Sequence, residues 1–393
     1  MTRIVAELVE RGHQVHVVTS LPWYRAHAIE PGWQGRRVRR EATSWGSITR
    51  IDPFAGDDKA NLVRRALGFA AFSVLAGWRG LRAGGRLRSV DGVIAMSPPL
   101  TLGLTGRLVA WLRGAGLVFN IQDVFPDAAI RTGAISNRLV IVLALALERW
   151  SYRAADAVTV LSEDLRVNVV AKLPPRRTDT VHVIPNFVDT DAIRPQDRMT
   201  DHRETLGLGD RPVVMYAGNI GFSQSLDLVV FAARALPEVQ FVISGEGAAK
   251  ATLAAEAASL PNLHVGGFVA AEFLPDLLAT GDVHVVPLKR GLGNVSVPSK
   301  AYSIMAAARP IVAAIDAGTA IPQILAESGG GIAVEPDDHD AFVDALRRML
   351  ADPVEAAEMG RLGRRWVERE ASPAAVGEAY DQLVRGLVTR ADP

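Results

Sequence analysis

The stretch VPSKAYSIMAAARPIVAA, residues 297–314, contains the pattern that recurs along this chain. The alanine-rich segment after Pro298 is typical of a short helix, and the apolar residues after Pro310 predict a buried strand directly behind it. A helix that leads into a wholly apolar strand is typical of a parallel sheet with helices on both faces. The stretch therefore predicts an α/β fold.

Further apolar runs repeat this pattern through the second half of the chain. They occupy residues 212–218, 240–245, 263–267, 283–288, 310–315 and 331–336. The first half repeats the theme at residues 13–20, 47–51, 90–97, 116–123, 156–162 and 181–186. Two doubly wound, Rossmann-like domains are therefore expected.

The chain opens on MTRIVAELVERGHQVHVVTS, which predicts a helix followed by a strand. A doubly wound domain usually begins instead with a strand and a glycine-containing loop. We therefore expect the first domain to lack its opening strand. The prolines and polar residues of 185–197 are typical of a linker. The predicted domains span residues 1–187 and 188–371, and a final helix over 372–393 is expected to pack back on the first domain.

Composition excludes several classes of protein. The chain has no cysteine, which excludes disulfides, thiolate catalysis and zinc–thiolate sites. No run reaches the ~18 uncharged apolar residues of a membrane span, and the charges among the first residues argue against a signal peptide. We therefore expect a cytoplasmic protein.

The charge is distributed unevenly although its formal net value is zero. Residues 1–185 hold 25 Lys and Arg against 15 Asp and Glu, so the remainder is net acidic. The basic first half, with apolar helices predicted at 66–78 and 139–147, suggests peripheral contact with an anionic membrane. Solvated surface arginines and helices buried in the core explain the same features equally well. Nucleic acid is not an expected partner, because the arginines lack interleaved aromatic residues.

Ligands of open parallel sheets bind beyond the carboxyl ends of the strands, so the loops there are candidate sites. Glycine turns, which allow close approach to the backbone, and polar residues lie in these loops. They are Gly218, Asn219 and Gly221 after one strand, Gly245 and Glu246 after the next, and Gly267 and Phe268 after the third.

The triplet Pro298-Ser299-Lys300 lies at the same predicted edge. Ser299 is expected to cap the helix, and the first-turn amides together with the Lys300 ammonium would attract an anion. A plain helix cap is the alternative interpretation. Because Lys289 and Lys300 are two of only five lysines and both fall among the glycine turns, we expect them to bind a diphosphate.

The first domain has its densest polar cluster in NIQDVFPD, residues 120–127. Asp123 could bind an acceptor hydroxyl or take its proton, or it could cap the turn before Pro126. Asp127 is interpreted as a helix cap. Asp189 and Asp191 form a D-x-D motif in the linker, and DDHD at 337–340 precedes a helix whose dipole it complements. We expect neither a metal site nor a cofactor.

The chain resembles the retaining glycosyltransferases of family 4, which have the GT-B fold, over essentially its whole length. The branch it most resembles is that of colanic-acid and O-antigen polysaccharide biosynthesis. The matching segments are ERGHQVHVVTS, NIQDVFPDAAIRTGAI, VIPNFVDTDAIRP, MYAGNIGFSQSLD, ISGEGAAKATL, LHVGGFVAAEFLP and VPSKAYSIMAAARPIVAA. Val295 and Ser303 depart from the family pattern, because many members have glutamates at these two positions.

This resemblance implies a nucleotide-diphospho-sugar donor, a UDP-sugar or a GDP-sugar, bound by the second domain. The base would lie near Gly267 and Phe268, and the diphosphate against Gly218, Asn219 and Lys300. A glycan or polyprenyl-diphosphate-linked acceptor would bind the first domain, with Asp123 on the acceptor side and no obligatory metal. Such an enzyme would act at the inner face of the cell membrane. A nucleotide-sugar epimerase and a catalytically silent sugar-nucleotide-binding protein are the alternatives.

Overall fold

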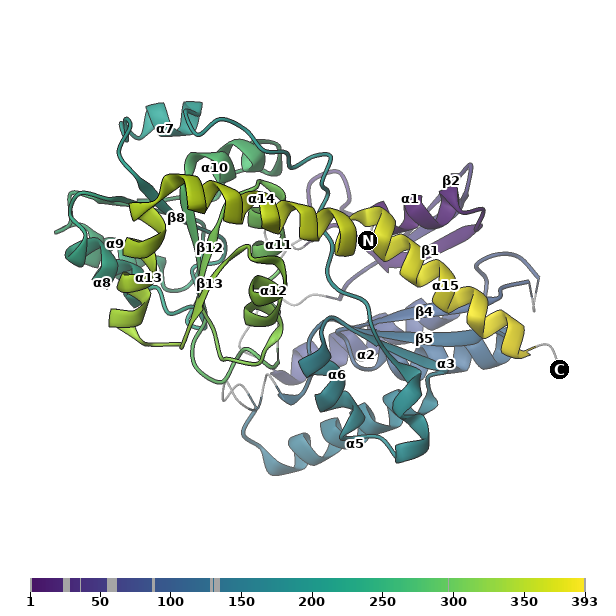
Figure 1. Cartoon of the computed structure of the whole chain (residues 1–393). Helices are drawn as coiled ribbons and strands as arrows, with labels where there is room; N and C mark the ends of the chain where they lie inside the picture. The colour runs from purple at the N-terminus through teal and green to yellow at the C-terminus, as the bar shows by residue number, and fades with distance from the viewer. Residues whose placement is uncertain are drawn as a thin grey trace. The chain divides into compact units, whose positions relative to one another are not determined.

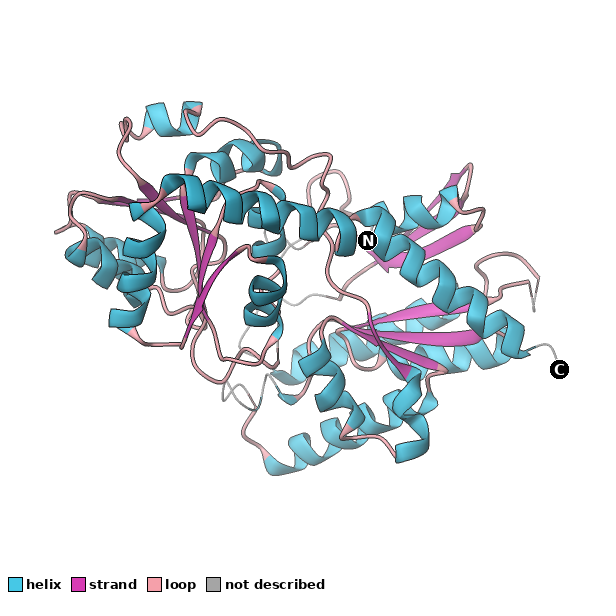
Figure 2. Ribbon diagram, in the orientation of Figure 1, coloured by secondary structure: helices cyan, strands magenta, loops and turns pink. Residues whose placement is uncertain are grey.

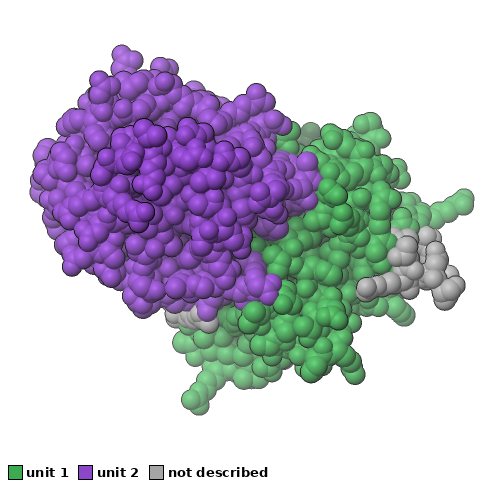
Figure 3. Space-filling view, in the orientation of Figure 1, with its two compact units in different colours: residues 1–161, 165–184, 377–393 green, residues 162–164, 185–376 purple. Residues whose placement is uncertain are grey.

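The computed structural model describes residues 2–23, 29–35, 37–54, 62–86, 89–127, 130, 135–295 and 297–391 (Figure 1). Helices and strands alternate along most of the chain (Figure 2). The residues form two compact units, which Figure 3 colours separately. Unit 1 comprises residues 1–161, 165–184 and 377–393, and unit 2 comprises residues 162–164 and 185–376.

Unit 2 contains one six-stranded parallel sheet. Its strands are β8 (Val213–Ala217), β9 (Gln240–Ser244), β10 (Leu263–Gly266), β11 (Val283–Pro287), β12 (Ile311–Ala314) and β13 (Gly331–Val334). They lie in the order β10-β9-β8-β11-β12-β13, which is the Rossmann order with its reversal between β8 and β11. Nearly every residue of β8, β9, β11 and β12 is buried, as a sheet covered on both faces requires. The predicted doubly wound fold is confirmed.

Eight α-helices belong to unit 2 over most of their length. They are α7 (Asp201–Thr205), α8 (Asp227–Ala235), α9 (Lys250–Ala257), α10 (Leu274–Thr280), α11 (Lys300–Ala306), α12 (Ala320–Ser328), α13 (His339–Ala351) and α14 (Pro353–Glu370), with a 3₁₀ turn, η2, at Ala271–Phe273. Side chains fix several of their ends. Asp352 accepts hydrogen bonds from the first amides of α14, and Pro353 suits the first helical position.

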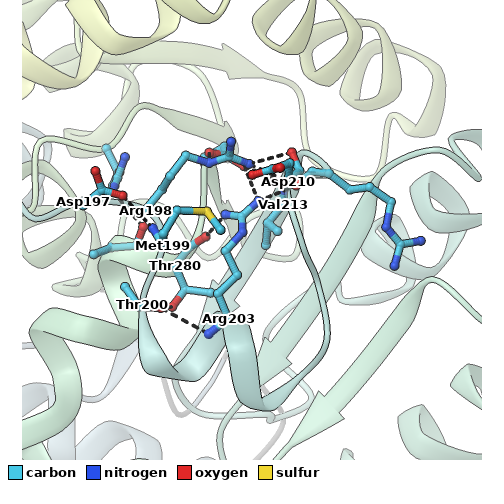
Figure 4. A network of polar contacts seen from close by, with 12 residues as sticks. Asp197, Arg198, Met199, Thr200, Arg203, Asp210, Val213 and Thr280 are labelled. Atoms are coloured by element: carbon cyan, nitrogen blue, oxygen red, sulfur yellow. Dashed lines mark hydrogen bonds and ion pairs between the residues drawn. The ribbon is translucent and has the colours of Figure 1, made fainter.

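A polar network holds the amino-terminal edge of this sheet (Figure 4). Asp282, just before β11, accepts hydrogen bonds from the Arg198 guanidinium at 3.1 Å and from the Val213 amide at 2.8 Å. Arg203 is 1 % exposed, lies 3.4 Å from Asp282, and donates to the Thr280 carbonyl at 2.9 Å. The network lies at the edge of the sheet opposite to the glycine turns and is therefore structural.

Unit 1 contains two sheets among its described residues. The first has the order β1-β3-β2, with β1 (Val15–Ser20), β2 (Val38–Thr43) and β3 (Gly46–Ile51). The second is parallel and has the order β4-β5-β6-β7, with β4 (Gly92–Ser97), β5 (Gly116–Ile121), β6 (Ala157–Val160) and β7 (Val181–Val183). Strands β1 and β4 are each paired on one side only.

Strand β2 was missed by the sequence analysis. It runs antiparallel to β3 at a sheet edge and carries Arg39 and Arg40, which are exposed. Arg39 and Arg50 both lie over the ring of Trp33, at 4.4 and 5.1 Å from its centroid. An edge strand tolerates such charges because one of its sides faces water. The arginine-rich sequence of β2 lacks the apolar pattern from which a strand is predicted.

The helices of unit 1 are α1 (Thr2–Glu10), α2 (Leu62–Gly80), α3 (Leu102–Arg113), α5 (Arg138–Ala154), α6 (Glu163–Val170) and the 3₁₀ helix η1 (Pro175–Thr180). The last helix, α15 (Pro373–Ala391), belongs to unit 1 from Gly377 onward. The two faces of the four-stranded sheet are covered differently. Leu387 of α15 packs on Val118 of β5, whereas Gly106 of α3 lies against Leu117, whose side chain points to the other face.

Candidate functional site

The candidate site lies in unit 2, at the carboxyl ends of β8 and β11. These two strands are neighbours at the point where the strand order reverses. Residues 218–226 follow β8 and residues 288–299 follow β11. A doubly wound sheet offers a crevice for ligands at this point. The sequence analysis placed Gly218, Asn219 and Lys300 here.

A chain of hydrogen bonds connects these loops. The Lys300 ammonium donates to the Tyr216 hydroxyl at 2.6 Å, and this hydroxyl donates to the Asn219 carbonyl at 2.6 Å. Lys300 Nζ also lies 4.0 Å from the centroid of the Tyr216 ring, within the range of a cation–π contact. Tyr216 is fully buried at the end of β8. The lysine is therefore fixed at the switch point by a tyrosine that the sequence analysis did not select.

Burial lowers the pKa of Lys300 from its ordinary value to about 7. Desolvation disfavours the charged ammonium, and the hydroxyl, ring and carbonyl around it supply only partial compensation. An anionic group beside Nζ would favour the charged form. Gly218 lets the ammonium approach the backbone closely, since a Cβ at this glycine would lie only 3.2 Å from Nζ. The arrangement suits an anionic ligand at neutral pH.

The glycines after β8 and β9 bring two loops into direct contact. The Gly218 amide donates to the Ser244 carbonyl at 2.9 Å, and the Ile220 amide donates to the Glu246 carbonyl at 2.8 Å. A Cβ at Gly245 would lie 1.8 Å from the Gly218 carbonyl oxygen, which leaves no room for any other residue. The predicted glycine turns are thus close backbone contacts that form one continuous edge.

The ends of β9 and β10 form a second polar cluster. Glu246 and Lys250 make an exposed ion pair of 2.6 Å, and this hydrogen bond from Lys250 lowers the pKa of the Glu246 carboxyl. A Cβ at Gly267 would lie 3.4 Å from the Glu246 carboxylate, and the Gly267 carbonyl accepts from Ser244 at 2.9 Å. Phe268 is 71 % exposed beside this cluster. Lys250 was missed by the sequence analysis, because it stands within a helix.

The loop after β11 is anchored by Asp316, which the sequence analysis also missed. Its carboxylate accepts hydrogen bonds from the Gly291 amide at 2.8 Å and from the Gly293 amide at 3.0 Å. The Lys289 amide donates to the Ser223 carbonyl at 3.0 Å, while its side chain is exposed. Asp316 follows β12 in the sequence. It reaches the loop after β11 because β11 and β12 are parallel neighbours, which the sequence alone does not show.

The prediction that Ser299 caps α11 is wrong. Ser299 has helical backbone angles, and its side chain makes no capping hydrogen bond. The amides of Ala301 and Tyr302 donate to the carbonyls of Pro298 and Ser299, both at 3.2 Å. These amides were expected to be open donors, but the tight first turn satisfies them. The helix end therefore offers fewer open donors than predicted, and the binding of a diphosphate by Lys300 stays a prediction.

The polar cluster of unit 1 separates into three roles. Asn120 is buried, and its amide donates to Thr159 and to the Tyr380 hydroxyl of α15, so it is structural. The interpretation of Asp127 as a simple cap is incomplete, because it pairs with Lys172 at 2.8 Å. Asp123 follows β5 and is partly exposed, and its acceptor role stays a prediction.

The acidic motifs have structural partners. Asp189 accepts from the amides of Asp191 and Ala192, which closes a turn. Asp338 caps α13 through the Ala341 amide at 3.0 Å, as predicted. No group of three or more His, Asp and Glu side chains in the described part of the chain is arranged to hold a metal ion.

Two family profiles and a curated relative match the chain. Residues 1–186 match the family profile described as "Glycosyl transferase 4-like domain", and residues 211–352 match "Glycosyl transferases group 1". The chain is 29 % identical to the Escherichia coli (strain K12) protein named "Putative colanic acid biosynthesis glycosyl transferase WcaI", over 98 % of this chain and 94 % of that protein.

Solved structures share the fold. Sucrose-phosphate synthase from Thermosynechococcus elongatus superposes with a TM-score of 0.76 at 18 % identity, covering 99 % of this chain and 92 % of that one. Anabaena HepE, solved in complex with UDP-glucose, superposes with a TM-score of 0.62 at 14 % identity, covering 80 % and 82 %. The two family profiles and the Escherichia coli relative show that the chain is a glycosyltransferase of the family 4 type, and the solved structures show that it has the GT-B fold.

Proposed function

We propose that this glycosyltransferase moves a sugar from a UDP-sugar to a glycan or a polyprenyl-diphosphate-linked glycan, with retention of the anomeric configuration. Unit 2 binds the donor and unit 1 binds the acceptor. The transferred group is a hexose or an N-acetylhexosamine, and the product belongs to a cell-envelope polysaccharide. The observation that carries the proposal is the half-buried Lys300 at the switch point, held by Tyr216 beside Gly218.

Three features support a diphosphate donor. The ammonium of Lys300 faces the glycine turn after β8, where phosphate oxygens reach backbone without steric conflict. The exposed ring of Phe268 offers a stacking surface for the base next to the Glu246–Lys250 pair. The related HepE was solved with UDP-glucose. Val295, where many family members have a glutamate, is buried and apolar, so the ribose hydroxyls require another acceptor, for which Glu246 is available.

The histidines do not favour an epimerase. His284 is fully buried in β11, bonded to the Leu278 carbonyl at 2.8 Å, and burial lowers its pKa to about 4. His264 pairs with Gln240, and His13 pairs with Asp381. None of these three side chains contacts the cluster around Lys300 in the described structure. Acid–base chemistry on a bound sugar would need such groups beside the donor.

A panel of nucleotide sugars tests the donor. A ligand present at about 100 times its dissociation constant adds ~2.7 kcal/mol to stability, so the correct UDP-sugar should raise the melting temperature while ADP-sugars should not. With that donor and lipid-linked glycan acceptors, NMR of the product should show the anomeric configuration of the donor. Stabilisation by no nucleotide sugar would contradict the donor assignment. Inversion at the anomeric carbon would contradict retention, and binding without transfer would favour a silent binding protein.

Binding of UDP should take up a proton at pH 8. Free Lys300 is then mostly neutral, because its pKa is about 7, and a neighbouring diphosphate raises this pKa. The affinity should therefore fall by up to about tenfold per pH unit as the pH rises above about 7. Calorimetry in two buffers of different protonation enthalpy measures the uptake. Lys300→Met should abolish it, and an equal uptake by this variant would assign the proton to another group.

A further inference from the structure

Three neighbouring helices of unit 1 have apolar outer faces. The sequence analysis left open whether the segments 66–78 and 139–147 belong to the core. Many of their apolar side chains are exposed, so these side chains are not part of the core. The exposed residues are Leu67, Val74 and Trp78 on α2, Leu104, Leu108, Trp111 and Leu112 on α3, and Leu139, Val142, Leu143 and Trp150 on α5. Val74 is 74 % exposed, Trp111 is 66 % and Leu139 is 67 %. Most of the spacings are three, four or seven residues, so each set forms a stripe along one side of its helix.

These stripes belong to one surface because the helices pack side by side. Helix α3 lies between the other two. Ser73 of α2 is hydrogen-bonded to Thr101 just before α3, at 2.7 Å. A Cβ at Gly103 of α3 would lie 2.5 Å from the Ser151 hydroxyl of α5, which shows how closely these two helices approach. The opposite sides of α3 and α5 are buried against the four-stranded sheet, so the stripes face outward. We call this surface the α2–α3–α5 face.

The α2–α3–α5 face is also basic. Helices α2 and α3 contain no acidic residue, and the one acid of α5, Glu148, is fully buried and paired with Lys172. Arg138, Arg149 and Arg153 are exposed on α5. The guanidinium of Arg82, just past the end of α2, lies 3.4 Å from the centroid of the Trp78 ring. Arg107 is already paired with Asp156 at 3.2 Å.

We propose that the α2–α3–α5 face docks on the surface of an anionic lipid bilayer. Helices that lie in the membrane interface combine leucine, valine and tryptophan with flanking arginines. Their tryptophan rings lie at the level of the lipid headgroups. A second copy of the chain fits less well, because it would bring two sets of exposed arginines together. No helix in the described part of the chain combines the length and apolar character needed to cross a bilayer. Docking on a membrane needs no sugar donor or acceptor, so it can be measured independently of transfer.

Flotation of the full chain with lipid vesicles tests the docking. Wild type should float with vesicles of phosphatidylcholine and about 30 % phosphatidylglycerol, and less with phosphatidylcholine alone, because each arginine near an anionic surface contributes about fivefold in affinity. Leu108→Ser/Trp111→Ser should weaken vesicle binding by at least about tenfold. Arg149→Gln/Arg153→Gln should weaken it by on the order of tenfold and reduce its salt dependence.

The matched control is Phe273→Ser/Val354→Ser, which removes two exposed apolar side chains from unit 2 and should leave vesicle binding unchanged. Circular dichroism of each variant confirms folding. Equal binding of wild type and Leu108→Ser/Trp111→Ser would overturn the proposal. A second result would also overturn it: light scattering without vesicles shows that wild type is a dimer and that Leu108→Ser/Trp111→Ser is a monomer. The α2–α3–α5 face would then be an interface between copies of the chain. Binding that ignores lipid charge would refute the anionic specificity.

Discussion

Replacement of Lys300 by methionine should reduce kcat/KM for the donor about 10- to 100-fold, since a hydrogen bond to a charged group contributes ~1.5–3 kcal/mol. The methionine keeps the length of the aliphatic stem that packs beside Gly218 and removes the ammonium bonded to Tyr216. Donor-dependent transfer and donor hydrolysis measure the effect. The melting temperature should stay equal or rise, because the buried amine has an unfavourable desolvation that lowers its pKa.

Arg361→Met is the matched control for this variant. It removes an exposed cation of the same unit, paired with Glu358 on α14, and should change kcat/KM by less than about twofold. Lys300→Arg should not rescue activity, because the larger guanidinium has no space beside Gly218. Unchanged transfer and hydrolysis in Lys300→Met would remove Lys300 from the diphosphate site, whereas loss of activity together with unfolding would make it a structural residue.

Replacement of Asp282 by alanine should destabilise unit 2 by about 3 kcal/mol, the lower end of the cost of leaving a buried charge unpaired. The variant leaves Arg203, which is 1 % exposed, without its carboxylate, and it removes the acceptor of the Val213 amide at the start of β8. Because the remaining partners of Arg203 are carbonyl oxygens, they supply no full negative charge. The midpoint of urea unfolding, followed by tryptophan fluorescence and circular dichroism, measures the change.

Asp344→Ala provides the comparison for this stability measurement. Its side chain is 74 % exposed and pairs with Arg347 one helical turn away, so the loss should be below about 0.5 kcal/mol. Donor binding to the folded Asp282→Ala protein should be unchanged, since the network lies at the amino-terminal edge of the sheet. Equal stability of the two variants would show that Arg203 does not depend on the carboxylate.

Much of unit 2 was predictable from the sequence because its strands are continuous apolar runs with glycine at their ends. Lys300 and the glycine turns were found by their position after those runs. Tyr216 and Asp316 were missed, because each acts through a neighbour that only the folded sheet brings near. Lys250 was missed because it stands in a helical stretch, although its partner Glu246 is only four residues away. Periodicity identifies which residues face a common side, but it does not show which side chains of separate strands or loops meet.

Predictions from local sequence were wrong or incomplete where tertiary packing determines the structure. Serine before a helix usually caps it, yet Ser299 already lies within the tight first turn that follows Pro298. The apolar segments of α2 and α5 look like core sequence, and their exposure emerges only when the sheet occupies the opposite sides of these helices. Strand β2 was not predicted because its arginines leave no apolar pattern in its sequence. Its pairing partner β3 supplies the apolar side chains instead.

Helix α15 makes unit 1 a discontinuous body, with consequences for the order in which the chain folds. Leu387 completes the apolar layer over Val118, and Tyr380 satisfies the buried Asn120. On the ribosome, the strands of unit 1 emerge first, but one face of the four-stranded sheet stays uncovered until α15 leaves the exit tunnel. Unit 2 already has residues 185–376 by then and completes its own sheet first. We therefore expect unit 1 to complete its packing after unit 2, although most of its residues are synthesised first.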